Sequence, residues 1–172
     1  MNSKALFAFL VFTSSASLLA AEPKELVTAR SEYEHATPRD EAARTRYLTS
    51  LVPLRDKFAR ANATADWQAV DAEMRHHPVS KDADPKALSA LIVGRWTSPR
   101  HEYLDRKDGT WVMLPEEAGS PHGHWHVEGN QFVSTDSTDP KKPSRYTILL
   151  LTPKDFVFTD GKIVFYETRS HK

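Results

Sequence analysis

Alanine and glycine are divided almost completely between the two halves of the chain, and this division limits the fold more than any other feature. All six glycines lie at or beyond Gly94, whereas 18 of the 19 alanines precede that position. Alanine is the best helix former, and glycine is the residue that tight connections between strands most often require. The division therefore predicts an α+β protein in which a helical segment, residues 22–91, precedes a β segment, residues 92–170.

The helical segment carries apolar residues at helical spacing. They recur in two series, at Tyr47, Leu51, Leu54 and Phe58 and at Trp67, Val70 and Met74. Residues three and four positions apart lie on one face of a helix, so each series predicts an amphipathic helix and together they predict a helical hairpin. Pro53 lies inside the first series and removes a backbone donor there. Because the series continues on both sides of it, we expect a kink rather than a break.

The β segment shows a hydrophobic period of two, with turn signals every eight to twelve residues. The candidate strands are Ile92–Thr97, Arg100–Asp105, Thr110–Leu114, His124–Glu128, Gln131–Thr135, Arg145–Leu151, Phe156–Thr159 and Lys162–Arg169. Short links such as Asp160-Gly161 require sequential antiparallel hairpins. An eight-stranded meander hides its edges by closing on itself, so we expect a small up-and-down β-barrel whose own side chains leave at most a shallow cavity.

Two motifs in this segment resemble the lipocalin-like barrels. Gly94-Arg95-Trp96 is similar to the Gly-x-Trp that opens such barrels, and the last strand ends in Thr168-Arg169. The stretch from Gly123 to Asn130 also resembles small lipocalin-like domains of secreted bacterial proteins, some of which follow an Ala-rich helical pair. The resemblance implies that an arginine of the last strand covers the tryptophan at the closed end, which gives Gly94, Trp96 and Arg169 structural roles. It also implies a binding or structural function without catalytic residues.

Strand alternation permits this contact between Trp96 and Arg169. A two-residue Asp160-Gly161 turn would place Phe158 opposite Ile163 and Phe156 opposite Phe165. Alternation then carries Arg169 to the same inward face as Phe165.

The chain begins with the features of a secretory signal peptide. Residues 1–21 combine a positive charge at Lys4, an apolar run and a small-residue end at Ala20-Ala21. We therefore expect a secreted or periplasmic protein without a membrane span. The 23 Lys and Arg residues balance 23 Asp and Glu residues, so the electrostatic term that drives nucleic-acid binding is missing. The absence of cysteine excludes disulfides and thiolate chemistry.

Three histidines form the best candidate for a metal site. His122, His124 and His126 alternate along a strand and project to one outward face, where imidazole could bind Zn, Cu or Ni. A third ligand would come from His122 itself or from His101. The alternative is a solvated strand face that carries histidines.

Two functional classes remain open. In the first, the barrel binds a small apolar or amphipathic ligand through Tyr103, Trp111, Phe132 and Tyr146, although these aromatics could also be core residues. In the second, the helical stripe packs either on the barrel or on a protein partner, including a second copy of the chain. No Gly-x-Ser-x-Gly elbow or phosphate-binding loop is present, so no catalytic residue or cofactor is indicated.

Overall fold

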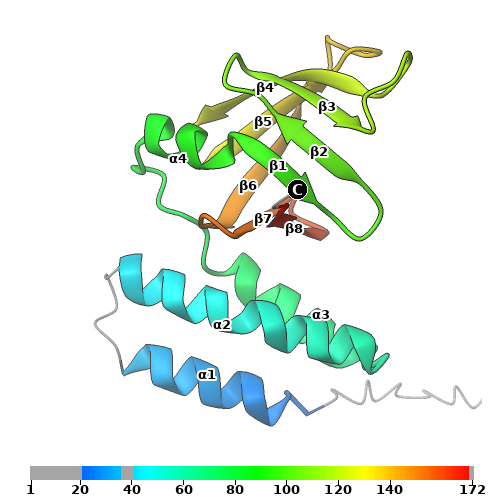
Figure 1. The fold of residues 1–172 in the computed structure, drawn as a ribbon. Coiled ribbons are helices and arrows are strands. Elements are labelled where there is room, and N and C mark those ends of the chain that lie inside the picture. Colours follow the sequence, from blue (N-terminus) through cyan, green and yellow to red (C-terminus); the bar gives the residue numbers. More distant parts are fainter. Residues whose placement is uncertain (1–20, 36–40, 171–172) are drawn as a thin grey trace, which may run out of the picture.

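Four helices precede a closed eight-stranded barrel in the computed structural model, which describes residues 21–35 and 41–170 (Figure 1). The helices are α1 (Lys24–Glu34), α2 (Glu41–Arg60), α3 (Thr64–Arg75) and α4 (Pro85–Ile92). The strands are β1 (Gly94–Thr97), β2 (Glu102–Asp105), β3 (Thr110–Leu114), β4 (His122–Glu128), β5 (Gln131–Asp136), β6 (Ser144–Leu151), β7 (Asp155–Thr159) and β8 (Val164–Arg169). Each strand pairs antiparallel with its sequence neighbours, and β1 pairs with β8. The predicted α+β fold and up-and-down barrel are confirmed.

The predicted signal peptide, except for Ala21, lies outside the described residues. Among the residues that the structure describes, no helix combines the length and hydropathy that a membrane span requires. Helix α2 runs without interruption through Pro53, as the continued apolar series indicated.

The predicted register of the last hairpin is wrong by two residues. Phe158 lies opposite Phe165, and Phe156 lies opposite Glu167. The connection has four residues, 160–163, because the Asp160 carboxylate accepts hydrogen bonds from the backbone N–H groups of Lys162 and Ile163, both at 2.8 Å. A shift of two preserves the inward and outward faces, so Arg169 still points inward.

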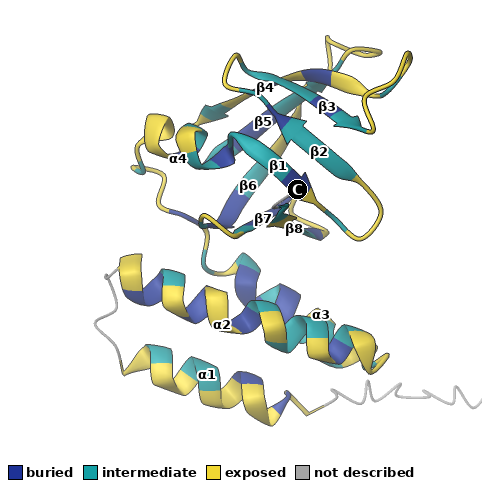
Figure 2. Cartoon of the chain, in the orientation of Figure 1, coloured by how far each residue is buried: buried dark blue, intermediate teal, exposed yellow. Residues whose placement is uncertain are grey.

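Helices α2 and α3 pack against the outer face of β6, β7 and β8, and α1 packs on α2 on the side away from the barrel (Figure 1). Figure 2 shows the buried residues of these helices on the sides that face one another and the barrel. The core that they share with the barrel includes both predicted apolar series of α2 and α3 and, from the strands, Leu149, Leu150, Val157 and Val164. The helical stripe is therefore covered within the same chain.

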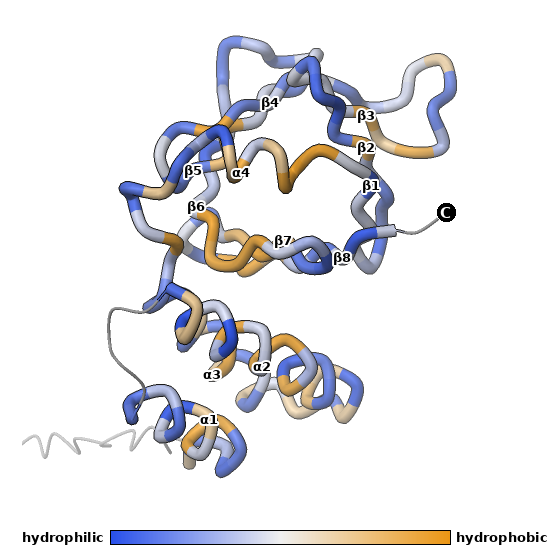
Figure 3. The backbone as a smooth tube through the Cα atoms, turned by 60° about the vertical axis from the view of Figure 1, so that its left-hand side comes forward, coloured by the Kyte–Doolittle hydropathy of each residue, from blue (hydrophilic) through white to orange (hydrophobic). Residues whose placement is uncertain are grey.

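Strand β6 contributes side chains to both of its faces. Ile148 and Leu151 belong to the barrel interior, whereas Leu149 and Leu150 belong to the core shared with the helices. The pairing with β7 shifts between Ile148 and Leu150, and such a bulge lets two consecutive residues serve one side. Figure 3 shows the resulting hydrophobic stretch of β6 and β7 on the side of the barrel nearest the helices.

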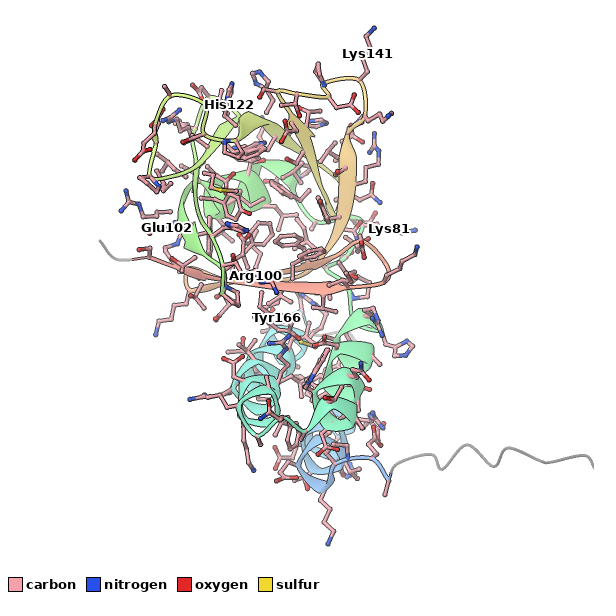
Figure 4. The ribbon with its side chains drawn as sticks, turned by 90° about the vertical axis from the view of Figure 1, so that its right-hand side faces the viewer. Lys81, Arg100, Glu102, His122, Lys141 and Tyr166 are labelled. Atoms are coloured by element: carbon pink, nitrogen blue, oxygen red, sulfur yellow. The ribbon has the colours of Figure 1, made fainter. Side chains whose placement is uncertain are left out.

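Polar anchors fix the helices on the barrel. Arg44 of α2 is buried and donates to the carbonyl oxygens of Leu149 at 2.7 Å and His77 at 2.8 Å. Tyr166 of β8 points toward the helices (Figure 4), and its hydroxyl donates to the Asp71 carboxylate of α3 at 2.7 Å. These contacts join segments far apart in the sequence, and they orient the helical layer.

We expect Tyr166→Phe to lower the free energy of unfolding by about 2 kcal/mol, because it removes a hydrogen bond to a buried carboxylate. Tyr146→Phe is the matched control, since no described residue accepts from the Tyr146 hydroxyl, and it should change stability by less than about 0.5 kcal/mol. Urea unfolding followed by circular dichroism measures both. Equal effects of the two variants would contradict the anchoring role of Tyr166.

Helix α4 belongs to the barrel rather than to the other helices. The Asp84 carboxylate caps it by accepting from the backbone N–H of Lys86 at 2.9 Å. Its buried residues Leu88 and Ile92 pack with Trp96 in the barrel interior. Because α4 continues through Ile92, strand β1 begins at Gly94 and not at Ile92 as the pattern predicted.

Candidate ligand-binding site in the barrel lumen

The end of the barrel next to α4 is closed by the Trp96–Arg169 pair, as the resemblance to lipocalin-like barrels implied. The guanidinium carbon of Arg169 lies 4.2 Å from the centroid of the Trp96 ring, and the two residues are opposite each other in the β1–β8 pairing. The indole N–H donates to the carbonyl oxygen of Ile92 at 2.6 Å. Trp96 is fully buried, so the pair forms a solid floor for the lumen.

Backbone carbonyls occupy the donors of the Arg169 guanidinium. Nη1 donates to Val93 at 2.9 Å, Nη2 donates to Leu91, and Nε donates to Pro153 at 2.9 Å. Arg169 forms no salt bridge with any residue that the structure describes. Its charge is thus held by carbonyl dipoles and an aromatic face, and no carboxylate is paired with it.

Beyond this floor the lumen contains a cavity of about 290 Å³. Its lining is aromatic with a few polar groups: Tyr103, Asp105, Trp111, Phe132, Ser134, Asp136, Ser144, Tyr146, Phe156, Phe158, Phe165 and Glu167. The four residues that the sequence suggested for ligand contact, Tyr103, Trp111, Phe132 and Tyr146, all line this one cavity. The volume would hold about ten water molecules, so the barrel interior is less filled than its short strands suggested.

The aromatic rings of the lining contact one another in two groups. The rings of Phe158 and Phe165 stack with their centroids 5.2 Å apart, and Tyr146 meets Phe158 edge-on at 5.2 Å. Across the lumen wall, Tyr103 packs edge-on against Trp111 at 6.1 Å. Rings that constrain one another in this way form a rigid apolar surface.

The backbone of β5 lies close to Trp111 and holds its ring in the barrel wall. Its indole N–H donates to the carbonyl oxygen of Thr135 at 3.1 Å. Gly123 lies between them, and a Cβ at that position would meet the Thr135 oxygen at 1.8 Å and the Trp111 nitrogen at 2.7 Å. Glycine at 123 therefore permits the Trp111 contact that lines the cavity.

Three carboxyl groups line the lumen: Asp105, Asp136 and Glu167. Asp136 accepts hydrogen bonds from Thr138, at 2.7 Å from the backbone N–H and at 2.6 Å from the hydroxyl. Asp105 on β2 has only 5% of its surface exposed, and Glu167 on β8 is half-buried. Within the described part of the chain, no group donates a hydrogen bond to either carboxyl, and neither forms a salt bridge. Burial raises the pKa of Asp105 to about 7, although the nearby Arg169 charge opposes this shift. Burial raises the pKa of Glu167 to about 8, and the charge of Asp105 raises it further.

Asp105 and Glu167 are the functional candidates that the sequence reasoning missed. Strand alternation contained the signal, because Tyr103 was assigned to the inside and Asp105 follows it by two residues. In the same way, Glu167 lies between the inward residues Phe165 and Arg169. Carboxylates are rarely buried without a partner, so alternation alone does not predict that an inward Asp or Glu stays unpaired in a cavity.

A second pocket of about 310 Å³ lies on the outside of the barrel beside β8. The β1–β8 seam contains only the pairs Trp96–Arg169 and Thr97–Thr168, so the first part of β8 has β7 as its strand partner. The outer pocket is lined there by the turn 98–101 and by Arg55 of α2. It shares Tyr103, Phe165 and Glu167 with the lumen. These three residues therefore form the wall between the lumen and the outside.

The predicted metal-binding histidines lie on the outer surface, away from the lumen. His122, His124 and His126 are exposed, and alternate residues of β4 point inward, as predicted. His126 contacts the Glu128 carboxylate at 2.8 Å, and His122 contacts the carbonyl oxygen of Ser120 at 2.9 Å. Figure 4 places His122 at the part of the barrel farthest from the helices. Among the described residues, no group of three or more His, Asp or Glu side chains is arranged to hold a metal ion.

The barrel topology is compatible with the lipocalin-like fold that the sequence motifs resemble, because all eight strands are antiparallel and closed. The Trp96–Arg169 pair at the closed end agrees with that comparison. Searches among protein families, curated proteins and solved structures found no match to the chain. The geometry of the lumen is therefore the basis for assigning a function.

Proposed function

We propose that the protein is a non-catalytic binding module whose barrel lumen takes a small amphipathic molecule. The observation that carries this proposal is a cavity of about 290 Å³ in which aromatic rings surround two carboxyls that have no partner among the described residues. Small-molecule sites are mostly apolar with a few convergent polar groups, and this lumen has that composition. Its volume is near the lower end for such sites, which favours a small ligand.

The alternative function, association through the helices, receives less support from the packing. The apolar series of α2 and α3 that suggested it are buried against β6, β7 and β8. Among the described residues, the large apolar side chains that remain exposed are Val27 and Ile163, and they lie on different parts of the chain. A partner that bound the apolar stripe would have to displace the barrel from it.

We also propose that the protein acts in a secreted or periplasmic location. This part of the proposal rests on residues 1–21, which have the charge, apolar run and small residues of a signal peptide. Amino-terminal sequencing of the protein from its own host tests it, with Glu22 expected as the first residue. A mature protein that retains Met1 would contradict it.

Filling the lumen should abolish ligand binding. Ser134 lines the cavity and Thr135 follows it on the outer face of β5, so Ser134→Leu fills the site and Thr135→Leu is the matched control. We expect the neutral probe N-phenyl-1-naphthylamine to gain fluorescence with the wild-type protein and with Thr135→Leu. The affinity of Ser134→Leu should be at least about 10-fold lower, which corresponds to the loss of a modest apolar contact area.

Either of two results would contradict the binding function of the lumen. If the wild-type protein gives no fluorescence change, or if Ser134→Leu binds the probe as the wild type does, the lumen is not the site. Retention of a small-molecule adduct in native mass spectrometry of protein purified from its host would support the function independently.

A further inference from the structure

The charged groups of the cavity lining are all acidic. Asp105, Asp136 and Glu167 line the lumen, and the lining contains no Lys, Arg or His. The nearest cation at the floor, Arg169, donates to three backbone carbonyls and forms no salt bridge with described residues. Asp105 and Glu167 therefore have no salt-bridge partner among the described residues, although Glu167 also lines the outer pocket to which Arg55, Arg100 and His101 belong.

The burial of Asp105 makes its lack of a partner energetically important. Asp105 keeps only 5% of its surface exposed, no described donor hydrogen-bonds to its carboxyl, and its oxygens reach solvent through the lumen. Buried polar groups are normally satisfied, and an exception inside a cavity points to a missing partner. A donor that enters the lumen can supply that partner, because Asp105 lines the cavity.

The aromatic lining specifies the kind of positive group that fits. Rings of Phe, Tyr and Trp attract a cation through their faces, most strongly when both are removed from water. Tyr103 and Trp111 pack against each other beside Asp105 on the paired strands β2 and β3. A hard metal ion such as Mg²⁺ or Ca²⁺ requires six or more oxygen ligands and gains little from such rings. An organic ammonium group uses both the carboxylates and the rings.

Resting on the proposed binding function, we infer that the ligand is a small organic ammonium compound whose positive group lies between Asp105 and Glu167 and whose apolar part contacts the aromatic wall. The two carboxyls come from strands on opposite sides of the β1 strand and share Tyr103 as a neighbour. In the absence of a cation they hold protons near neutral pH, because burial raises the pKa of both. Binding of a permanent cation is then accompanied by proton release.

Two probes of nearly equal size and shape separate the effect of charge on affinity from the effect of shape. Phenyltrimethylammonium and tert-butylbenzene have nearly the same size and differ by one positive charge. We expect the cation to bind the wild-type protein at pH 8.5 about 30-fold more tightly than the neutral compound, as measured by displacement of N-phenyl-1-naphthylamine and by calorimetry. The double variant Asp105→Asn with Glu167→Gln should lose this preference and keep its affinity for tert-butylbenzene. Glu128→Gln, on the outer surface, is the control variant and should retain the preference.

Proton release provides a readout that a purely structural role of the carboxyls would not give. At pH 7 the heat of phenyltrimethylammonium binding should change with the ionisation enthalpy of the buffer, and this dependence should vanish in the double variant. Equal affinity for the two probes, or an unchanged preference in the double variant, would overturn the ammonium inference while leaving the binding function intact. If neither probe nor N-phenyl-1-naphthylamine binds, the binding function itself fails.

Discussion

We expect Gly94→Ala to lower the free energy of unfolding by about 3 kcal/mol or more. Gly94 has a φ of +147°, a conformation that residues with a side chain rarely adopt. A Cβ there would lie 2.0 Å from Nη1 of Arg169, so the guanidinium would have to leave its place. The barrel would then lose the contact over Trp96 and the hydrogen bonds to Leu91 and Val93 at its closed end.

A second glycine supplies the control for this prediction. Gly161 also has a positive φ, +93°, but no atom lies within 4 Å of a Cβ placed on it. Gly161→Ala therefore carries only the backbone strain, about 1–2 kcal/mol. Urea unfolding of both variants gives the difference. If Gly94→Ala is no more destabilising than Gly161→Ala, the Trp96–Arg169 pair does not require the space that glycine leaves.

The second large effect has the opposite sign. We expect Asp105→Asn to stabilise the folded protein by on the order of 4 kcal/mol at pH 8.5 and to have little effect near pH 4. The ordinary pKa of this carboxyl, 3.8, applies to the unfolded chain, whereas burial raises it to about 7 in the folded protein. Between these values the folded state binds more protons than the unfolded state. The free energy of unfolding of the wild type therefore falls as the pH rises from about 4 to about 7 and then levels off.

The groups that face Asp105 set the size of this effect. Arg169 of β8 lowers the pKa of Asp105 by its charge, and Glu167 of the same strand is coupled to Asp105 by repulsion. Tyr103 is the titratable neighbour on β2, and its pKa is raised mainly by burial. Asparagine keeps the shape of the side chain and removes the ionisation, so the variant should show a flatter dependence of stability on pH.

Asp108 provides the matched control for the pH dependence. This exposed carboxylate accepts hydrogen bonds from the Thr110 hydroxyl at 2.7 Å and from the Thr110 N–H at 3.0 Å, and they lower its pKa. A lowered pKa contributes stability above about pH 4 that disappears as the pH falls. Asp108→Asn should thus be less stable than the wild type at pH 8.5 and equal to it in acid. Urea unfolding at pH 3 and pH 8.5 measures all three proteins. Loss of stability in Asp105→Asn at pH 8.5 would mean that the Asp105 carboxylate is compensated in the fold.

A carboxyl that weakens the fold and faces a cavity is consistent with a binding role. Stabilising replacements are common at functional sites, because such sites hold groups for a ligand rather than for the fold. An organic ammonium ligand would restore the lost interaction of Asp105 and would raise the stability of the complex. The stability and binding experiments therefore both test whether the Asp105 carboxyl lacks a partner in the folded protein.

Much of the barrel could be predicted because alternate residues of a strand point to opposite faces, so the direction of each side chain follows from its neighbours in the sequence. The period of two placed Trp96 and Arg169 on the inside, and it placed His124 and His126 on the outside. Aromatic side-chain chemistry suggested Tyr103, Trp111, Phe132 and Tyr146 as ligand contacts, and all four line one cavity. The directions of Trp96, Arg169 and the histidines needed only side-chain alternation along the strands.

The run from Ile148 to Leu151 shows where local pattern fails. All four residues are buried, so the sequence has no alternation from which to assign faces. A bulge turns Leu149 and Leu150 toward the helices, and Arg44, 105 residues earlier in the chain, binds the Leu149 carbonyl. Helices α2 and α3 cover this outer face, and their packing position cannot be predicted from a short stretch of sequence.

Local hydrophobic period and turn chemistry were sufficient for the helix-then-barrel order, for the eight antiparallel strands and for the inward direction of the aromatic residues. Contacts between distant segments established the remaining properties: the packing of the helices on β6 to β8, the size of the lumen, and the environment that leaves Asp105 and Glu167 without a salt-bridge partner among the described residues. The physical reason is that a side chain's direction depends on its neighbours along the strand. Its burial and its pKa depend on every group that the folded chain brings around it.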